Sequence, residues 1–267
     1  GHQGVGKSYT TLKLSLHQAF FAKHRRSTCI FDTNGNEYEK VEIDGTTHKI
    51  KQIYANQIIK FGQQKTTDVV RVSTIKPNGM PMDLEEKEKL LCYTMNYLRN
   101  SILVIEDIST IYGDSLPQEI TSLFCNVRHK SIDCVAHLQS LARIVPKIYQ
   151  NCKIIRYHYQ LDSIEMSKDK LRDEYETLKI TEKLVNTQYF SGNKHFFVYV
   201  DREERKIRGM FSPRMFSAAI QEYLSENSSK LKPILQKRDA HGKQIYRYEN
   251  ALLIKTKELF VKYFGNK

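Results

Sequence analysis

The first eight residues constrain the fold more than any other segment of the chain. They read Gly-His-Gln-Gly-Val-Gly-Lys-Ser and match the pattern GxxxxGK[ST] at every fixed position. In such a loop, backbone N–H groups wrap around phosphates, and the following helix adds its positive N-terminal end. A helix is expected over residues 8–24, because apolar residues recur there at helical spacing: Leu12, Leu16, Ala19 and Phe20.

A loop of this kind normally lies between a buried strand and a helix. Residue 1 is already the first glycine of the loop, so the first core strand is missing from the given chain. We expect another segment to fill that central place in the sheet.

The loop predicts binding of ATP together with Mg²⁺. Lys7 should reach the β- and γ-phosphates, and the hydroxyl of Ser8 should hold the metal ion. A glycine turn that merely begins a helix is the alternative. The residues expected to contact the nucleotide are those of the loop and the next residue: Gly1, Gly4, Val5, Gly6, Lys7, Ser8 and Tyr9.

Two adjacent acids follow a short, wholly apolar segment at residues 102–105, which is typical of a buried parallel strand. Glu106 would organise Mg²⁺ through water, and Asp107 would polarise the attacking water. The more common order is Asp-Glu, so Asp107 is one methylene shorter than the usual base. The alternative is a strand end capped by solvated acids.

The next expected strand, residues 132–138, leads directly into Gln139. An amide at the tip of the neighbouring strand can donate to the γ-phosphate and sense its loss. An ordinary loop glutamine is the alternative. His137, on the same strand, is expected to be structural, because the histidines of the chain show no defensible metal-ligand spacing.

Strands and helices alternate up to about residue 160, which predicts an α/β fold with a parallel sheet flanked by helices. The expected ATPase core is therefore 1–160. Residues 161–267 are expected to form a helix–hairpin–helix appendage. Its predicted parts are a long charged helix at 161–187, a hairpin at 195–211, a helix capped by Ser212 and Pro213, a basic stretch at 230–247 and a terminal helix.

The amino-acid composition indicates a binding partner and a cellular compartment. The 42 lysines and arginines exceed the 30 acids, and a net charge of +12 favours a polyanion such as DNA, although a solvated lysine-rich surface is the alternative. None of the five cysteines forms a CxxC pair, so reduced cysteines in a cytoplasmic protein are expected rather than a zinc site. No stretch approaches the ~18 apolar residues of a membrane span.

Several elements together resemble the FtsK–HerA superfamily of P-loop ATPases, which have a RecA-like core. Residues 32–38 resemble its D-x-x-G-E-Y turn, with an Asn inserted between Gly35 and Glu37. Arg128 resembles the arginine that precedes the glutamine strand. Residues 139–152 resemble the segment before the last core strand. The resemblance covers about residues 1–160.

The resemblance implies a ring-forming motor that moves DNA, most similar to viral genome-packaging ATPases. Phage assembly ATPases of the zonula occludens toxin (Zot) type are the second resemblance, although they usually carry a membrane span. A homo-oligomeric hexamer or pentamer is implied, with capsid vertex proteins as further candidate partners and the host cytoplasm as the location of a viral protein. Arg128 is the favoured arginine finger supplied in trans, and Arg143 is the second candidate.

Two other classes of protein share the loop. One is a small-molecule kinase, but the chain shows no arginine-rich lid segment, and paired acids with a sensor glutamine suit water activation better. The other is a scaffold that binds ATP without hydrolysing it, which the Glu-Asp order permits.

Overall fold

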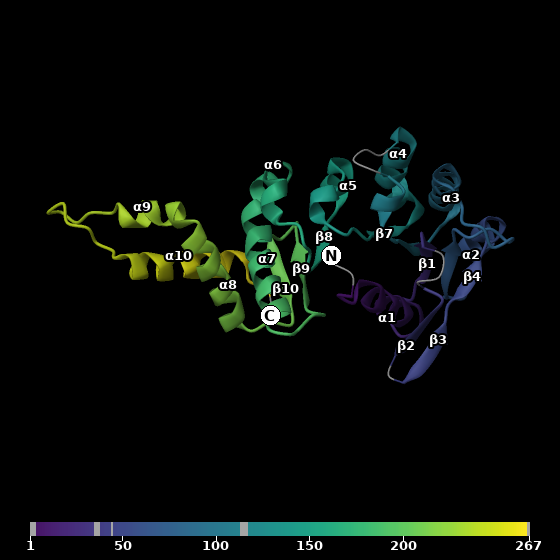
Figure 1. Ribbon diagram of the computed structural model, residues 1–267, viewed down its shortest axis with the longest axis horizontal. Coiled ribbons are helices and arrows are strands. Elements are labelled where there is room, and N and C mark those ends of the chain that lie inside the picture. The colour runs from purple at the N-terminus through teal and green to yellow at the C-terminus, as the bar shows by residue number, and fades with distance from the viewer. Residues whose placement is uncertain (1–3, 35–37, 44, 113–116, 266–267) are drawn as a thin grey trace. The chain divides into compact units, whose positions relative to one another are not determined.

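The computed structural model describes residues 4–34, 38–43, 45–112 and 117–265. The chain divides into two compact units. The N-terminal unit is Gly6–Asn151, and the C-terminal unit consists of Cys152–Lys267 with the short segment Gly1–Val5. Figure 1 shows the helices and strands of each unit.

The N-terminal unit contains a five-stranded sheet with the order β4-β5-β1-β6-β7, in which every neighbouring pair is parallel. This confirms the predicted α/β class with a parallel sheet. Parallel pairing places the carboxyl ends of β1, β6 and β7 at the same edge. The strands are β1 (Ser27–Asp32), β4 (Lys51–Ile53), β5 (Val69–Ser73), β6 (Ser101–Ile105) and β7 (Asp133–Ala136).

Helices cover both faces of this sheet, with α1 on one side and α3 and α4 on the other (Figure 1). The α-helices are α1 (Lys7–Phe20), α2 (Ile58–Gln63), α3 (Leu84–Tyr97), α4 (Gln118–Asn126) and α5 (Pro146–Asn151). Short 3-10 turns lie between them: η1 (Ala55–Gln57), η2 (Ile108–Thr110), η3 (Val127–Lys130) and η4 (Leu141–Arg143). A small antiparallel hairpin, β2 (Lys40–Ile43) and β3 (Thr46–Lys49), lies in the stretch where the sequence shows no clear periodicity.

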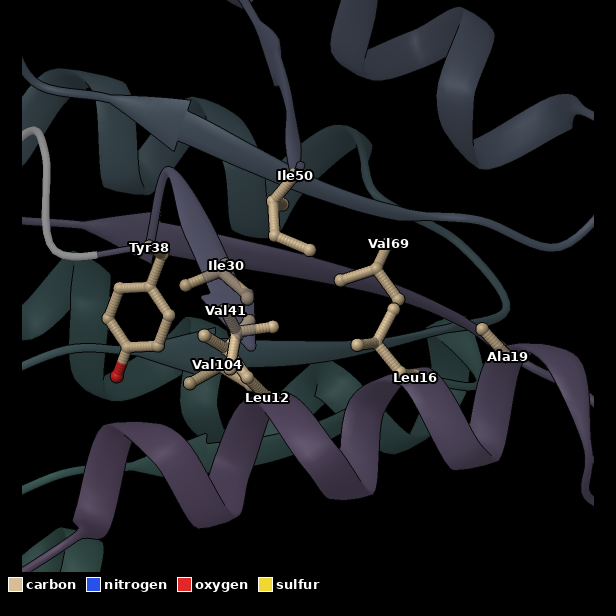
Figure 2. Packing of buried hydrophobic residues seen from close by; sticks show 9 residues of the cluster. All are labelled: Leu12, Leu16, Ala19, Ile30, Tyr38, Val41, Ile50, Val69 and Val104. Carbon is tan, nitrogen blue, oxygen red and sulfur yellow. The ribbon is translucent and has the colours of Figure 1, made fainter. Parts of the chain in front are cut away.

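The apolar face of α1 packs on the sheet. Leu12 and Leu16 lie against Ile30 and Val104 from the two central strands (Figure 2). Tyr38 lies at one end of this cluster and directs its hydroxyl away from the aliphatic side chains (Figure 2). Complete burial of one leucine side chain contributes about 1.5–3 kcal/mol, so the cluster holds the start of α1 firmly.

The strand β7 forms an edge of this sheet. It pairs with β6, and no other strand in the described ranges adds to its outer side. Its side chains are exposed or half-buried, whereas every residue of β1 is buried. The expectation that another segment fills the central place of the missing first strand stays a prediction.

The C-terminal unit has its own three-stranded antiparallel sheet, with the order β10-β9-β8. Its strands are β8 (Ile154–His158), β9 (Phe197–Asp201) and β10 (Lys206–Gly209). The predicted hairpin at 195–211 is present as β9 and β10. The strand β8, expected to end the parallel sheet, pairs instead with β9 over five residues. The division predicted at residue 160 stays a prediction.

The predicted long helix at 161–187 is interrupted. The chain turns at Arg172, which has a φ of 44°, and the Glu182 carboxylate accepts a hydrogen bond from the Ile164 backbone N–H at 2.7 Å. Ser212 caps α8 as expected, accepting from Met215 N–H at 3.2 Å. The helical elements of this unit are η5 (Ile164–Ser167), α6 (Lys168–Leu171), η6 (Arg172–Glu174), α7 (Tyr175–Phe190), α8 (Pro213–Glu226), η7 (Ser228–Leu231), α9 (Lys232–Leu235) and α10 (Tyr248–Tyr263).

Candidate active site

The phosphate loop has the backbone that its glycines predict. Gly4 and Gly6 both have a φ of 78°, in the left-handed region that glycine adopts without steric cost. Lys7 and Ser8 begin α1, whose first turn contains no acidic residue. Gly6, the N-cap residue, makes no side-chain cap hydrogen bond. The N-terminal end of a helix carries partial positive charge, as an anion site requires. Gly1 lies outside the described residues.

Glu106 directly follows β6, and the neighbouring strand β1 fixes its backbone. The Glu106 N–H donates to the Phe31 carbonyl at 3.1 Å. The Thr33 hydroxyl donates to the Glu106 carbonyl at 3.1 Å. The Thr74 hydroxyl, after β5, in turn donates to the carbonyls of Asp32 and Thr33. The ends of three strands are thus tied together where the acids stand.

A chain of buried hydrogen bonds links the side chain of Glu106 to the helix of the phosphate loop. Its Oε2 lies 2.6 Å from Nδ1 of His137, and Nε2 of that imidazole lies 2.9 Å from the Thr11 hydroxyl on α1. The Tyr38 hydroxyl donates to the same oxygen of Glu106. All four residues are buried. This chain connects α1 to the ends of β6 and β7.

The surroundings of Glu106 favour its ionised form. Burial alone would raise the pKa of this carboxyl. The hydrogen bond and charge of His137, the Tyr38 hydroxyl and the charge of Lys7 act in the opposite direction, and together they lower the pKa. Among the contacts of the described residues, only Oε2 accepts hydrogen bonds. The second oxygen, Oε1, is the one that could face a metal ion or its water.

Asp107 has an unusual backbone and a side chain held at both oxygens. Its φ of 41° lies in the left-handed region, which non-glycine residues adopt at a cost of about 1–3 kcal/mol and which is common at functional sites. The Ser109 hydroxyl donates to Oδ1, and the Gln139 amide donates to Oδ2 at 2.6 Å. The structure therefore brings together Asp107 and Gln139, which the sequence placed on neighbouring strands.

The sequence patterns assign no functional role to three residues of this cluster: Thr11, Tyr38 and His137. His137 was expected to be structural, but it contacts both Glu106 and Thr11. Its position two residues before Gln139, at the end of the same strand, was the available signal. Tyr38 belongs to the turn quoted above, of which residues 35–37 lie outside the described ranges.

The two candidate arginine fingers precede and follow β7 along the chain. Arg128 is in η3, which precedes the strand, and Arg143 is in η4, which follows it. Their backbone positions flank Gln139, but their side chains are not among those that the structure describes. Their roles stay predictions.

In the described part of the chain, no group of three His, Cys, Asp or Glu side chains could hold a metal ion. All five cysteines are free thiols; Cys29 and Cys92 are buried as expected, whereas Cys125 is exposed. Within the same described ranges, no helix is long and apolar enough to cross a membrane.

Solved structures of viral packaging NTPases are among those similar to this chain. The genome packaging NTPase B204 of Sulfolobus turreted icosahedral virus 2, in complex with AMP, has a TM-score of 0.50 and 16% sequence identity, covering 78% of this chain and 92% of that chain. The DNA-packaging ATPase B204 of Sulfolobus turreted icosahedral virus has a TM-score of 0.47 and 16% identity, with coverage of 78% and 92%. At this identity, the first match shows a shared fold. No curated protein matched the chain.

A protein-family model gives a more direct relationship. The model described as "Zonular occludens toxin (Zot)" matches residues 1–206, which is most of the 267-residue chain. Zot-type ATPases were one of the two resemblances that the motifs indicated. The chain belongs to the zonular occludens toxin (Zot) family.

Proposed function

We propose that this protein is an ATP-hydrolysing motor that moves DNA during the assembly of a virus or phage. The observation that carries the proposal is the pair of acids after β6. Glu106 is joined through His137 to the helix of the phosphate loop, and Asp107 is joined to Gln139 on the neighbouring strand. These connections hold acids and a glutamine beside the helix of the phosphate loop, and binding and hydrolysis of a nucleotide need such groups in one place.

The residues present fit ATP with Mg²⁺. Oxygen donors suit this ion, and a carboxylate with one oxygen uncommitted can hold one of its waters. Lys7 and the first turn of α1 would bind the phosphates, and Ser8 and Glu106 would hold the metal ion. When bound, Mg²⁺ would neutralise charge on the phosphate oxygens.

Asp107 is the proposed general base. One of its two hydrogen bonds would be replaced by a hydrogen bond from the attacking water. Asp107 would then take a proton from that water as the water attacks the γ-phosphorus and ADP leaves. Gln139, which donates to Oδ2 of Asp107, is the group best placed to be exchanged. Its amide would then turn toward the γ-phosphate and report whether that phosphate is still there.

DNA is the proposed track of the motor. The net charge of +12 favours a polyanion, and membership of the Zot family favours phage assembly. Genome packaging, the activity named for the similar viral NTPase, also requires a nucleic acid to be moved. The free cysteines support a place in the cytoplasm, that of the host if the protein is viral.

We further propose that the motor works as a homo-oligomeric ring in which a neighbouring subunit supplies Arg128. An arginine supplied in trans can accelerate hydrolysis by ~10³-fold or more. Arg128→Ala and Lys7→Ala proteins, each inactive alone, should regain ATPase activity when mixed, because some interfaces then hold an intact loop and an intact arginine. Mixed rings that stay inactive would point to Arg143.

The test of the motor function is ATP hydrolysis with and without DNA, followed by ATP-dependent displacement of a third strand from a DNA triplex. Lys7→Ala is the control that should lose both activities. We expect DNA to stimulate hydrolysis and ATP to drive displacement. Phosphate transfer to a metabolite would indicate a kinase, and ATP binding without turnover would indicate a scaffold.

A further inference from the structure

The segment that joins α9 to α10 forms a defined β-hairpin. We call α9 together with this hairpin, residues 232–247, the basic arm; it lies beyond the residues matched by the family model. Arg238 and Gln244 form an antiparallel bridge. On either side of it, Asp239 N–H donates to the Lys243 carbonyl at 2.9 Å, and Ile245 N–H donates to the Lys237 carbonyl at 3.1 Å.

The tip of the arm is shaped by its one acid. The Asp239 carboxylate accepts hydrogen bonds from the backbone N–H groups of His241 and Lys243, at 2.9 and 2.8 Å. Gly242 completes the turn with a φ of 75°. The negative charge of Asp239 is therefore committed to the turn, and the arm has a fixed shape rather than that of an unstructured linker.

The remaining charge on the arm is positive and exposed. Five cations stand against the single acid: Lys232, Lys237, Arg238, Lys243 and Arg247. All five are exposed, and in the described part of the chain none of them takes part in an ion pair. Lys230, just before the arm, differs because it pairs with Glu176 at 3.1 Å. The charge of the arm is thus available to a partner outside the unit.

We propose that the basic arm binds the phosphate backbone of DNA. A two-stranded β-ribbon fits the major groove of the duplex, and lysines and arginines along it can contact phosphates without reading the sequence. Tyr246 and Tyr248 at its base offer rings on which an unpaired base could stack. Residues 239–243 at the tip include no large apolar side chain, which disfavours insertion into a membrane.

This inference rests on the proposed function only in naming DNA as the ligand. The exposed positive charges themselves would suit any polymer with a phosphate backbone. In the motor, the arm would keep the protein on its track while the N-terminal unit hydrolyses ATP. Contacts to phosphates alone suit such a role, because the grip must be the same on every sequence that passes.

The experiment removes three charges from the distal half of the arm in the full chain, as Lys237→Gln, Arg238→Gln and Lys243→Gln together. Fluorescence anisotropy with labelled duplexes and single strands of two sequences, over a salt series, measures DNA affinity. We expect affinity at low salt to fall at least about tenfold, and the slope of log affinity against log salt to fall by about 2–3. ATP hydrolysis without DNA should be unchanged.

The matched control removes three exposed lysines from another hairpin and the strand after it, as Lys40→Gln, Lys49→Gln and Lys51→Gln. The net charge changes equally, so DNA affinity should change by less than about threefold if the arm is the binding element. Equal losses in the two variants would show that only total charge matters and would overturn the proposal. Unchanged DNA affinity in the arm variant would overturn it as well.

Two further results separate this proposal from that of the motor. If the arm variant binds DNA more weakly but the unmodified protein displaces no triplex strand, the arm is a DNA-binding element and the motor function is wrong. If the arm variant binds DNA and displaces the strand normally, the motor function is supported and the proposal for the arm is wrong. Vesicles containing phosphatidylserine are the remaining comparison; if the arm variant loses vesicle binding but keeps DNA binding, the arm is a lipid-binding element and the proposal is wrong.

Discussion

Both units bury charged side chains, but they use them differently. In the N-terminal unit, Glu106 stands at the end of a parallel strand, and the described hydrogen bonds reach only one of its oxygens. In the C-terminal unit, Glu182 lies within a helix and uses both oxygens. Lys179 donates to one at 2.6 Å, and the Ile164 N–H donates to the other at 2.7 Å.

The difference separates groups that hold the fold from groups that are free to act. Both contacts of Glu182 lie inside its own unit. The contact with Ile164 joins η5 to α7, and the contact with Lys179 lies within α7. Glu106 is buried to a similar extent, but its Oε1 accepts no hydrogen bond from the described residues. We infer that Glu182 is structural, because both of its oxygens are engaged within its own unit. The remaining oxygen of Glu106, at a strand end, leaves that acid able to act on a ligand. The predictions below test that distinction.

The largest expected effect is on turnover at Asp107. Asp107→Asn should lower the rate of ATP hydrolysis by about 10²- to 10⁴-fold, because a general base is lost. ATP affinity should change little, since Lys7 and Ser8 are intact. Steady-state kinetics and calorimetric titration with nucleotide measure the two quantities. The matched variant Glu182→Gln should leave turnover unchanged and lower the melting temperature; a large loss of turnover there would break the comparison.

An intermediate effect is expected at His137, a positioning residue that orients Glu106. His137→Ala should lower activity or Mg²⁺ affinity by about 10–100-fold, the usual consequence of removing a group that orients a ligand. The Mg²⁺ concentration for half-maximal activity should rise, and His137→Gln, which keeps a donor, should restore part of it. A lower melting temperature with unchanged Mg²⁺ dependence would place His137 among the structural residues, as the sequence suggested.

The smallest effect is expected at Glu176, in the C-terminal unit. Burial would raise the pKa of this carboxyl, but the Tyr263 hydroxyl, Lys230 and Lys262 together lower it. Tyr263 donates to Oε1 at 2.6 Å. Glu176→Gln should therefore lower the free energy of unfolding at pH 7 by about 1 kcal/mol, because the two lysines are half exposed and screened.

The pH dependence of this loss follows from the direction of the shift. A lowered pKa in the folded state means that the ionised form stabilises the protein above the unfolded pKa, near pH 4. The benefit disappears as the pH falls through the folded pKa. Urea unfolding at pH 7 and pH 3 should show the two proteins converging at the lower pH. A difference that persists there would mean that packing, not charge, holds this site.

Local sequence signals predicted the phosphate loop, α1 and the central strands, because each depends on residues close together in the chain. They missed the β2–β3 hairpin, because the apolar alternation of β2 covers only four residues and β3 has no apolar residue. They also missed the break at Arg172, because the contact from Glu182 to Ile164 is a tertiary one.

The site divides in the same way. Lys7, Ser8, Glu106, Asp107 and Gln139 could be proposed from the sequence because each lies in or beside a recognisable motif, and their roles stay predictions. The role of His137 could not be predicted, since it depends on a contact with Thr11 across 126 positions of the chain. A single histidine on a strand carries no information about what the adjacent helix presents to it.

The order of the two acids has an evolutionary consequence. Glu106 reaches sideways to His137 and Tyr38 through two methylenes, and an aspartate at that position would fall short of both. The common Asp-Glu order therefore cannot arise here by exchanging the acids alone. Among relatives of this chain, we expect the identity of the first acid to covary with the residues at positions 38 and 137, so that the three positions are inherited as one unit.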